Sequence, residues 1–124
     1  MKKYLELNDI TAYTIAFNLS NYIWDIVIKW DYFAKDTVGK QLVKAIDSAS
    51  ANIAEGFGRY FKKDKINFYR YSYGSIDESI DWIAKANKRG LLKESEYNHI
   101  NEELKKLPKE VNHLINFTNE KLSI

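Results

Sequence analysis

The stretch Ser48-Ala-Ser-Ala-Asn-Ile-Ala-Glu-Gly-Phe-Gly-Arg59 decides the fold predicted for this chain. It joins a run of small residues, typical of a packed helix, to a charged exit that contains two glycines. Glycine is favoured just past helix C-termini because it enters left-handed backbone conformations at low steric cost, so we expect Gly56 and Gly58 to end a helix. The stretch therefore predicts a helix followed by a tight turn, and it contains no catalytic constellation.

Length and composition predict one domain that spans residues 1–124. A chain of 124 residues can bury most of its apolar side chains around a single core. It has no cysteine, which excludes disulfides, thiolate metal sites and cysteine nucleophiles. The basic start Met1-Lys2-Lys3 is followed by acidic residues before any signal-peptide apolar region, and no apolar run approaches the roughly 20 residues needed to span a bilayer. We therefore expect a cytoplasmic protein without membrane contact.

Apolar residues recur at the helical period in four segments, which predicts an all-α fold. The first helix is expected from Asn8 or Asp9 to about Trp30, and the second from Asp36 or Thr37 to the two glycines. The third should begin at the cap Asp64 and end at Lys88-Arg89-Gly90, and the fourth should run from the region of residues 93–95 towards Leu122. Turns between four such helices predict a four-helix bundle, which we expect to run up-down-up-down. Pro108 should kink the fourth helix, or else split it into two pieces.

Two of these helices carry more apolar surface than a monomer needs. The first has two adjacent stripes, formed by Ile10, Tyr13, Phe17, Trp24 and Val27 and by Ala12, Ala16, Leu19, Ile23, Ile26 and Trp30. The third has an isoleucine- and tyrosine-rich stripe (Ile66, Tyr69, Tyr73, Ile76, Ile80 and Ile83) and a ridge of mostly small residues (Phe68, Ser72, Ser75, Ser79, Trp82 and Ala86). A ridge of this kind lets another helix approach closely, and we expect Gly74 beside it to have a packing reason. Large exposed apolar patches are rare on monomers, so the pattern predicts a homo-oligomer.

Several short motifs resemble one known protein family. They are Asn52-Ile53-Ala54-Glu55-Gly56 with Gly58-Arg59, then Gly74-Ser75 with Glu78, then Gly90-Leu91-Leu92 leading to Glu96-Tyr97. They resemble the bacterial four-helix-bundle family named after proteins encoded within 23S ribosomal RNA intervening sequences. The resemblance covers nearly the whole chain and implies an antiparallel bundle that forms a homopentameric ring, with no known reaction. More distantly, the chain is similar to the accessory proteins of diversity-generating retroelements, which form basic pentamers and work with a reverse transcriptase on nucleic acid.

The chemistry-bearing side chains favour a structural role over catalysis. Asn52, Glu55 and Arg59 would form a clasp at the exit of the second helix, because a carboxylate can accept hydrogen bonds from the arginine or from backbone amides. Glu55 as a general base would lack a partner nucleophile or histidine. We therefore predict a structural motif of Asn52, Glu55, Gly56, Gly58, Arg59 and Gly74, and we expect no enzyme and no cofactor.

No metal site is expected either. Glu96-x-x-His99 and Glu110-x-x-His113 have the spacing of di-iron four-helix proteins, but both pairs lie on one helix, whereas such a site needs them on two. The acidic residues Asp77, Glu78 and Asp81 have Arg70, Lys85 and Lys88 nearby, which favours an ordinary mixed-charge surface over a magnesium site.

The remaining candidate is the basic and aromatic segment from Arg59 to Tyr71. Its cations are Arg59, Lys62, Lys63, Lys65 and Arg70, and its aromatics are Tyr60, Phe61, Phe68, Tyr69 and Tyr71. Cations that neutralise phosphates beside aromatics that stack on bases are typical of single-stranded nucleic-acid sites. Alternatively, the aromatics fill core or subunit contacts and the lysines keep the turn soluble. The sequence thus predicts a non-enzymatic oligomeric scaffold or adaptor that binds RNA or DNA, with a protein-binding assembly hub as the alternative.

Overall fold

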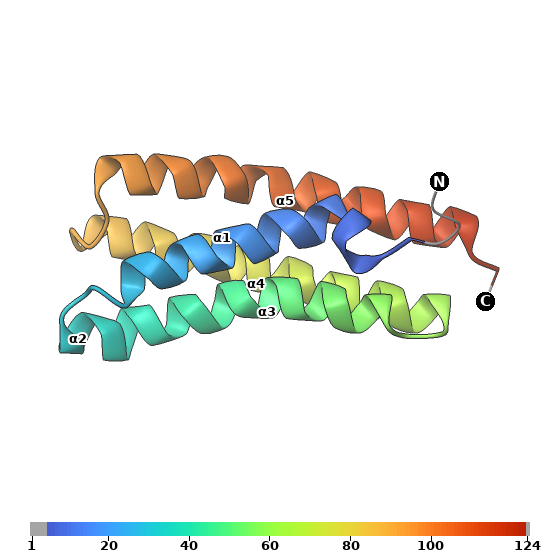
Figure 1. Ribbon diagram of the computed structural model, residues 1–124, viewed down its shortest axis with the longest axis horizontal. Coiled ribbons are helices and arrows are strands. Elements are labelled where there is room, and N and C mark those ends of the chain that lie inside the picture. Colours follow the sequence, from blue (N-terminus) through green and yellow to red (C-terminus); the bar gives the residue numbers. More distant parts are fainter. Residues whose placement is uncertain (1–4, 124) are drawn as a thin grey trace.

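The computed structural model describes residues 5–123, and within them it contains four long helices and no strand (Figure 1). The long helices are α1 (Thr11–Val27), α3 (Lys40–Phe57), α4 (Lys62–Lys88) and α5 (Glu94–Lys121). A 3-10 turn, η1 (Leu7–Asp9), precedes α1, and a short helix, α2 (Tyr32–Ala34), leads through a π-helical turn, η2 (Lys35–Gly39), into α3. The prediction of an all-α fold with four helices is confirmed.

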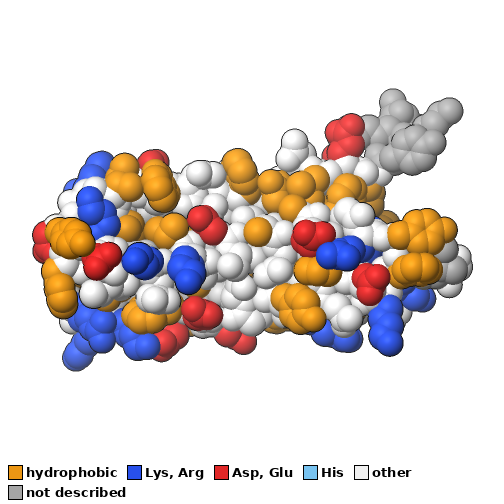
Figure 2. Space-filling model, turned by 90° about the horizontal axis from the view of Figure 1, so that it is seen from below, with side chains coloured by type: hydrophobic (Ala, Val, Ile, Leu, Met, Phe, Trp, Pro, Cys, Tyr) orange, Lys and Arg blue, Asp and Glu red, His pale blue; other side chains and the backbone are white. Residues whose placement is uncertain are grey.

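The four long helices lie side by side along the long axis of the molecule, and the chain turns back at each connection (Figure 1). α3 packs against α1 and α4, and α5 packs against α4 and α1, so the order around the core is α1, α3, α4, α5. On the face that Figure 2 shows, Lys and Arg side chains gather towards the two ends of the bundle. No helix within residues 5–123 combines the length and apolar composition that a bilayer-spanning segment needs.

One apolar stripe from each helix forms the core. The buried residues of α1 are those of its second expected stripe, Ala12, Ala16, Leu19, Ile23 and Ile26, together with Val27 and Ser20. The predicted core face of the second helix is buried in full: Val38, Leu42, Ala45, Ile46, Ala49 and Ile53. The α5 stripe is buried at Ile100, Leu104, Leu107 and Val111, and half-buried at Tyr97 and Leu114. Helical periodicity therefore identified the core faces of α3 and α5, whereas for α1 it gave two stripes, of which mainly the second is buried.

The small-residue ridge of α4 is occupied within the chain. Ser72, Ser79 and Ala86 are fully buried, and the Ser72 hydroxyl donates a hydrogen bond to the Ala49 carbonyl oxygen of α3 at 2.7 Å. The helix that approaches this ridge is thus α3 of the same chain. Ile80, which the expected core stripe included, is instead 42 % exposed, because the buried face of α4 lies closer to its serines.

Three of the expected helix starts are wrong. α1 begins after Ile10, and the Asp9 side chain instead accepts a hydrogen bond from the Glu6 backbone amide at 2.8 Å, which caps the 3-10 turn. The expected cap Asp64 is the third residue of α4 and not its start. The helix begins at Lys62, and a carboxylate in its first turn stabilises the free N–H end electrostatically.

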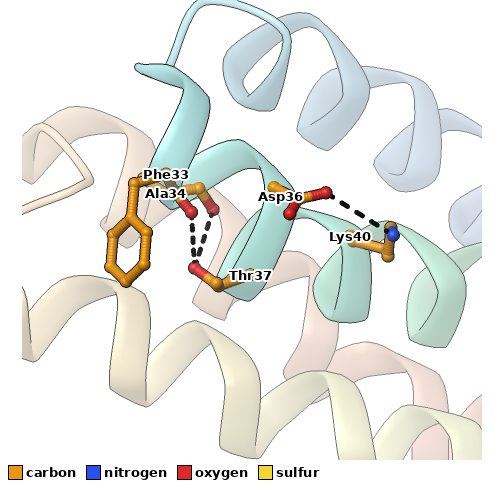
Figure 3. Close-up of polar contacts among 5 residues, drawn as sticks. All are labelled: Phe33, Ala34, Asp36, Thr37 and Lys40. Carbon is orange, nitrogen blue, oxygen red and sulfur yellow. Dashed lines mark hydrogen bonds and ion pairs between the residues drawn. The ribbon is translucent and has the colours of Figure 1, made fainter.

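The second helix starts earlier than Asp36 or Thr37. Asp31 caps α2 by accepting a hydrogen bond from the Ala34 amide at 2.9 Å, and the chain continues helically through η2. Within this turn Thr37 donates to the Phe33 carbonyl oxygen at 2.7 Å, and Asp36 pairs with Lys40 at 3.5 Å (Figure 3). The two expected cap residues therefore stabilise the interior of the helix and not its start.

The glycines of the Ser48–Arg59 stretch do not act through left-handed conformations. Gly58 has a φ of −79°, which any residue adopts, and α3 runs to Phe57. Gly56 lies inside α3, where an added Cβ would come within 2.7 Å of the Tyr69 ring and 2.9 Å of the Lys65 carbonyl oxygen. The close approach of α4 therefore requires this glycine. Gly90, with a φ of +74°, is the residue that ends a helix in the way expected.

Two further expectations concern Gly74 in α4 and Pro108 in α5. Nothing lies within 4 Å of a Cβ added at Gly74, so the packing reason expected for this glycine is absent from the described part of the chain. α5 continues through Pro108 as one helix, which excludes the alternative of two pieces. The Tyr73 hydroxyl donates a hydrogen bond to the Pro108 carbonyl oxygen at 2.7 Å and so joins α4 to this region of α5.

Candidate functional site

The turn between α3 and α4 exposes two adjacent aromatic rings at one end of the bundle. Tyr60 is 71 % exposed and Phe61 is 55 % exposed. Their ring centroids lie 5.0 Å apart in an edge-to-face arrangement. Exposed aromatics of this kind offer flat surfaces on which bases or partner side chains can stack.

Glu55 and Arg59 form the expected pair at the exit of α3. The Arg59 Nε donates to the Glu55 Oε2 at 3.1 Å, and the guanidinium lies 4.6 Å from the centroid of the Phe68 ring. Both members of the pair are exposed, and such pairs contribute about 0–1 kcal/mol to stability. No hydrogen bond joins Asn52 to either residue within the described range, so the clasp consists of Glu55 and Arg59 alone.

Lys65 is directed inward and not towards solvent. Its Nζ donates to the Phe57 carbonyl oxygen at 2.7 Å and lies 5.5 Å from the centroid of the Phe57 ring. Burial lowers the pKa of this lysine. Because a lysine near a helix C-terminus can satisfy its free carbonyl groups, Lys65 caps the end of α3 and is a poor candidate for a phosphate contact.

The other three predicted cations line one pocket between α4 and α5. Lys62, Lys63 and Arg70 line it from α4, and its volume is about 280 Å³. The Lys62 Nζ donates to the Asn119 carbonyl oxygen at 3.3 Å, which ties this rim to α5. No carboxylate in residues 5–123 forms an ion pair with any of the three cations. The structure thus divides the predicted set of five into three cations around a pocket, one of which also bonds to the α5 backbone, and two cations that bond to groups at the end of α3.

Sequence reasoning missed four further lining residues of this pocket: Ile66, Asn67, Ile115 and Asn119. Asn67 and Ile66 follow Lys63 and Lys62 by one helical turn, a spacing that would have placed them on the same face. Ile115 and Asn119 come from α5, and only the packing of α4 against α5 brings them to the site.

Tyr69 and Phe68 have different roles from those predicted for a stacking surface. Tyr69 is only 2 % exposed and packs in the core. Burial raises its pKa to about 12, and a hydrogen bond with Thr118 opposes this rise in part. Phe68 is half-buried beneath Arg59 and meets the exposed Tyr71 ring edge-to-face at 5.4 Å. Among these three aromatics, only Tyr71 offers a mainly solvent-exposed ring.

The candidate metal ligands lie apart from one another. The His99 ring packs 4.5 Å from the Tyr22 ring, whereas the His113 Nδ1 lies 3.6 Å from the Glu110 Oε1. Glu96 accepts a hydrogen bond from the Lys93 amide at 2.9 Å and so caps α5. In the described part of the chain, no three His, Cys, Asp or Glu side chains converge on a point where they could hold a metal ion.

A second hollow lies at the opposite end of the bundle, between α1 and α3. It has a volume of about 270 Å³, an apolar floor of Trp24, Val27, Ile28 and Val43, and a rim that includes Lys35, Lys40 and Lys44. Trp24 is 51 % exposed. The neighbouring Tyr32 and Phe33 of α2 are 73 % and 77 % exposed. This end therefore presents a broad apolar surface with basic edges.

Comparisons with known proteins place this geometry in context. The sequence model of a family described as 23S rRNA-intervening sequence protein matches residues 8–113. A solved structure from Bacteroides thetaiotaomicron, described as a protein of unknown function from the S23 ribosomal protein family, has a TM-score of 0.75 and 17 % sequence identity. The alignment covers 85 % of this chain and 98 % of that one, and at this identity it shows a shared fold. A search of curated proteins finds no match.

Proposed function

The chain belongs to the 23S rRNA-intervening sequence protein family, and from this premise we propose that it is a non-enzymatic oligomeric scaffold that binds RNA or DNA. The observation that carries the proposal is the gathering of Lys62, Lys63 and Arg70 around one pocket without a pairing carboxylate in the described range. Cations that no carboxylate neutralises can neutralise phosphates, and the release of counterions then provides the binding free energy.

The exposed aromatics next to this pocket support the same proposal. Tyr60 and Phe61 precede Lys62 directly, and Tyr71 follows Arg70. All three rings are more than half exposed. Stacking of a base on an aromatic ring contributes about 1–3 kcal/mol per base and tolerates any sequence.

The proposal includes a homo-oligomer of antiparallel up-down-up-down bundles, with five subunits and a cytoplasmic location. The exposed apolar side chains at the α2 end support self-association, because large apolar side chains that are exposed together are typical of a contact surface. Five copies of a three-cation site would act together on one strand and raise its affinity without any new contact. The number five and the similarity to retroelement accessory proteins stay predictions from resemblance.

A second candidate function is a protein-binding assembly hub without nucleic-acid binding. The apolar hollow of Trp24, Val27, Ile28 and Val43 favours it, since a hollow with an apolar floor and a polar rim is typical of protein interfaces. The two candidates differ in one measurable property. Only the scaffold binds nucleic acid with a strong dependence on salt.

The test compares two triple charge reversals of equal size. Lys62→Glu with Lys63→Glu and Arg70→Glu should lower the affinity for a labelled single-stranded oligonucleotide at least about tenfold, and should reduce the slope of log Kd against log salt by about 2. Fluorescence anisotropy at several salt concentrations measures both quantities.

The matched control reverses Lys35, Lys40 and Lys44 at the other end of the bundle. This variant has the same net charge as the first triple variant. An equal loss of affinity in both variants would therefore show that only the total charge of the protein matters. Wild-type protein that does not bind, or that binds independently of salt, would leave the assembly hub as the better proposal.

A further inference from the structure

We propose that the pocket between α4 and α5 is a subsite for one unpaired nucleotide, with its phosphate on the lysine and arginine side chains and its base between the two asparagines. This inference rests on the proposed nucleic-acid function and narrows the ligand to single strands. The pocket volume of about 280 Å³ lies near the lower end of the range for small-ligand sites, which fits one nucleotide better than a larger ligand.

The cations provide the phosphate half of the subsite. Lys63 and Arg70 are exposed and stand seven residues apart on α4, which places them on one face about two helical turns from each other. Asp64, next to Lys63 in sequence, and Glu120, next to Asn119 of α5, form no ion pair with them. A phosphate between these side chains would thus meet positive charge that no described carboxylate neutralises.

The asparagines provide the base half. Asn67 and Asn119 line the pocket from α4 and α5, and neither side-chain amide has a hydrogen-bond partner within residues 5–123. Each amide offers two N–H donors and one carbonyl acceptor, which are the groups that bind to base edges. Ile66 and Ile115 add an apolar surface against which the face of a base can lie.

A subsite that combines these cations with the two asparagines excludes a duplex from its base half. In a double helix the base faces are stacked and the Watson–Crick edges are paired, so a base cannot enter this pocket unless it leaves the stack. A purely electrostatic surface would bind single strands and duplexes through the cations alone, and its amides would be irrelevant. The asparagines therefore distinguish a nucleotide subsite from a basic patch.

The experiment measures the full chain by fluorescence anisotropy against a labelled oligo-uridine strand and a labelled RNA hairpin with the same number of phosphates. A non-nucleotide linker closes the hairpin stem, so that the hairpin contains no unpaired base. Asn67→Leu with Asn119→Leu should weaken binding of the single strand by about tenfold, because the edge contacts are lost. The same variant should leave hairpin binding and the salt slope unchanged, because the phosphate contacts remain.

The control variant replaces Asn98 and Asn116, two exposed α5 residues that do not line the pocket, with leucine. It adds the same apolar area, so it should leave both affinities at the wild-type value, and thermal melts of all variants report on folding. Equal weakening for strand and hairpin, or no weakening for either, would overturn the subsite.

A titration with uridine monophosphate separates a free nucleotide from a strand. If the monophosphate binds as tightly as the oligonucleotide, the pocket serves a free nucleotide and the strand subsite is wrong. If wild-type protein binds none of the three probes, the proposed nucleic-acid function fails together with the subsite. Binding of the hairpin alone would instead leave the proposed function standing and remove only the subsite.

Discussion

Tyr69 illustrates how the surroundings of a single residue decide its role. It belongs to the aromatic segment that suggested base stacking, but it is buried against the end of α3 and its ring would meet a Cβ added at Gly56. Burial disfavours the charged phenolate and raises the pKa of its hydroxyl from 10.0 to about 12. Tyr69 therefore contributes to stability, and the contribution depends on pH.

The fold should lose stability as the pH rises from about 10 to about 12. Over this window the unfolded chain releases the Tyr69 proton while the folded chain retains it, so ionisation favours unfolding. A shift of two units corresponds to about 2.7 kcal/mol, present below pH 10 and lost by pH 12. Denaturant melts at several pH values measure this loss.

Tyr69→Phe is the control for this dependence. It should cost about 1 kcal/mol at neutral pH through the lost hydrogen bond with Thr118, and it should flatten the alkaline decline. Burial also raises the pKa of Tyr73, which this variant retains, so the part of the stability loss that comes from Tyr73 remains. A variant that declines as steeply as the wild type would show that Tyr69 is not the responsible group.

At the scale of helices, the packing of α3 against α4 explains the small residues at their contact. Ser72 bonds directly to the α3 backbone, Gly56 leaves room for the Tyr69 ring, and Ala49 is fully buried opposite. Close approach of two helices requires such residues because a larger side chain would separate the backbones. The Ser48–Arg59 stretch is thus one half of a helix contact, and the serines of α4 are the other.

Two glycine-to-alanine substitutions should change stability in opposite directions. Gly56→Ala should destabilise the fold by about 1–3 kcal/mol, because the added Cβ overpacks against the Tyr69 ring and the Lys65 carbonyl. Gly74→Ala should stabilise it by about 1 kcal/mol, because Gly74 lies mid-helix with nothing within 4 Å. Urea melts of the two variants and the wild type give both values.

A destabilising Gly74→Ala would mean that another surface approaches Gly74 in solution. The same substitution would then reduce the oligomer mass. If Gly56→Ala left the free energy of unfolding unchanged, α3 and α4 could move apart without a loss of stability.

At the scale of the whole molecule, the two ends of the bundle differ in character. One end carries the α3–α4 turn with its cations and exposed rings, and the other carries α2 and the apolar hollow of Trp24. Phe17 and Trp24 of α1, and Ile28 directly after it, remain exposed although most of the second stripe of α1 is buried. This division supports a scaffold that binds nucleic acid at one end and associates through the other.

Light scattering on a gel-filtration column should give a mass of five times 14.6 kDa for the wild-type protein. Trp24→Glu should shift the mass towards that of one chain, because a charge would have to be buried in an apolar contact. Tyr60→Glu, the same change in charge at the other end, should leave the mass unchanged. A monomeric wild type would contradict the proposed assembly, and equal masses for the wild type and Trp24→Glu would move the contact elsewhere.

The sequence by itself determined the number of helices, most of their core faces and the family. These follow from helical periodicity and from local motifs such as Lys88-Arg89-Gly90, whose effects do not depend on distant parts of the chain. The helix starts were harder to predict, because Asp9, Asp36 and Asp64 are equally suited to a cap and to the interior of a first turn or bend.

Only the tertiary structure decided which charges are free and which rings are exposed. Lys65 and Lys63 are indistinguishable as cations in the sequence, but one bonds to the end of α3 and the other lines a pocket with residues of α5. Asn119 lies 49 or more residues from the α4 residues of this site, and only helix packing brings it there. The physical reason is that burial and pairing depend on which residues lie next to a side chain in space. A helical period shows which face of its own helix a residue occupies, but it does not identify the residues of other helices that pack against that face.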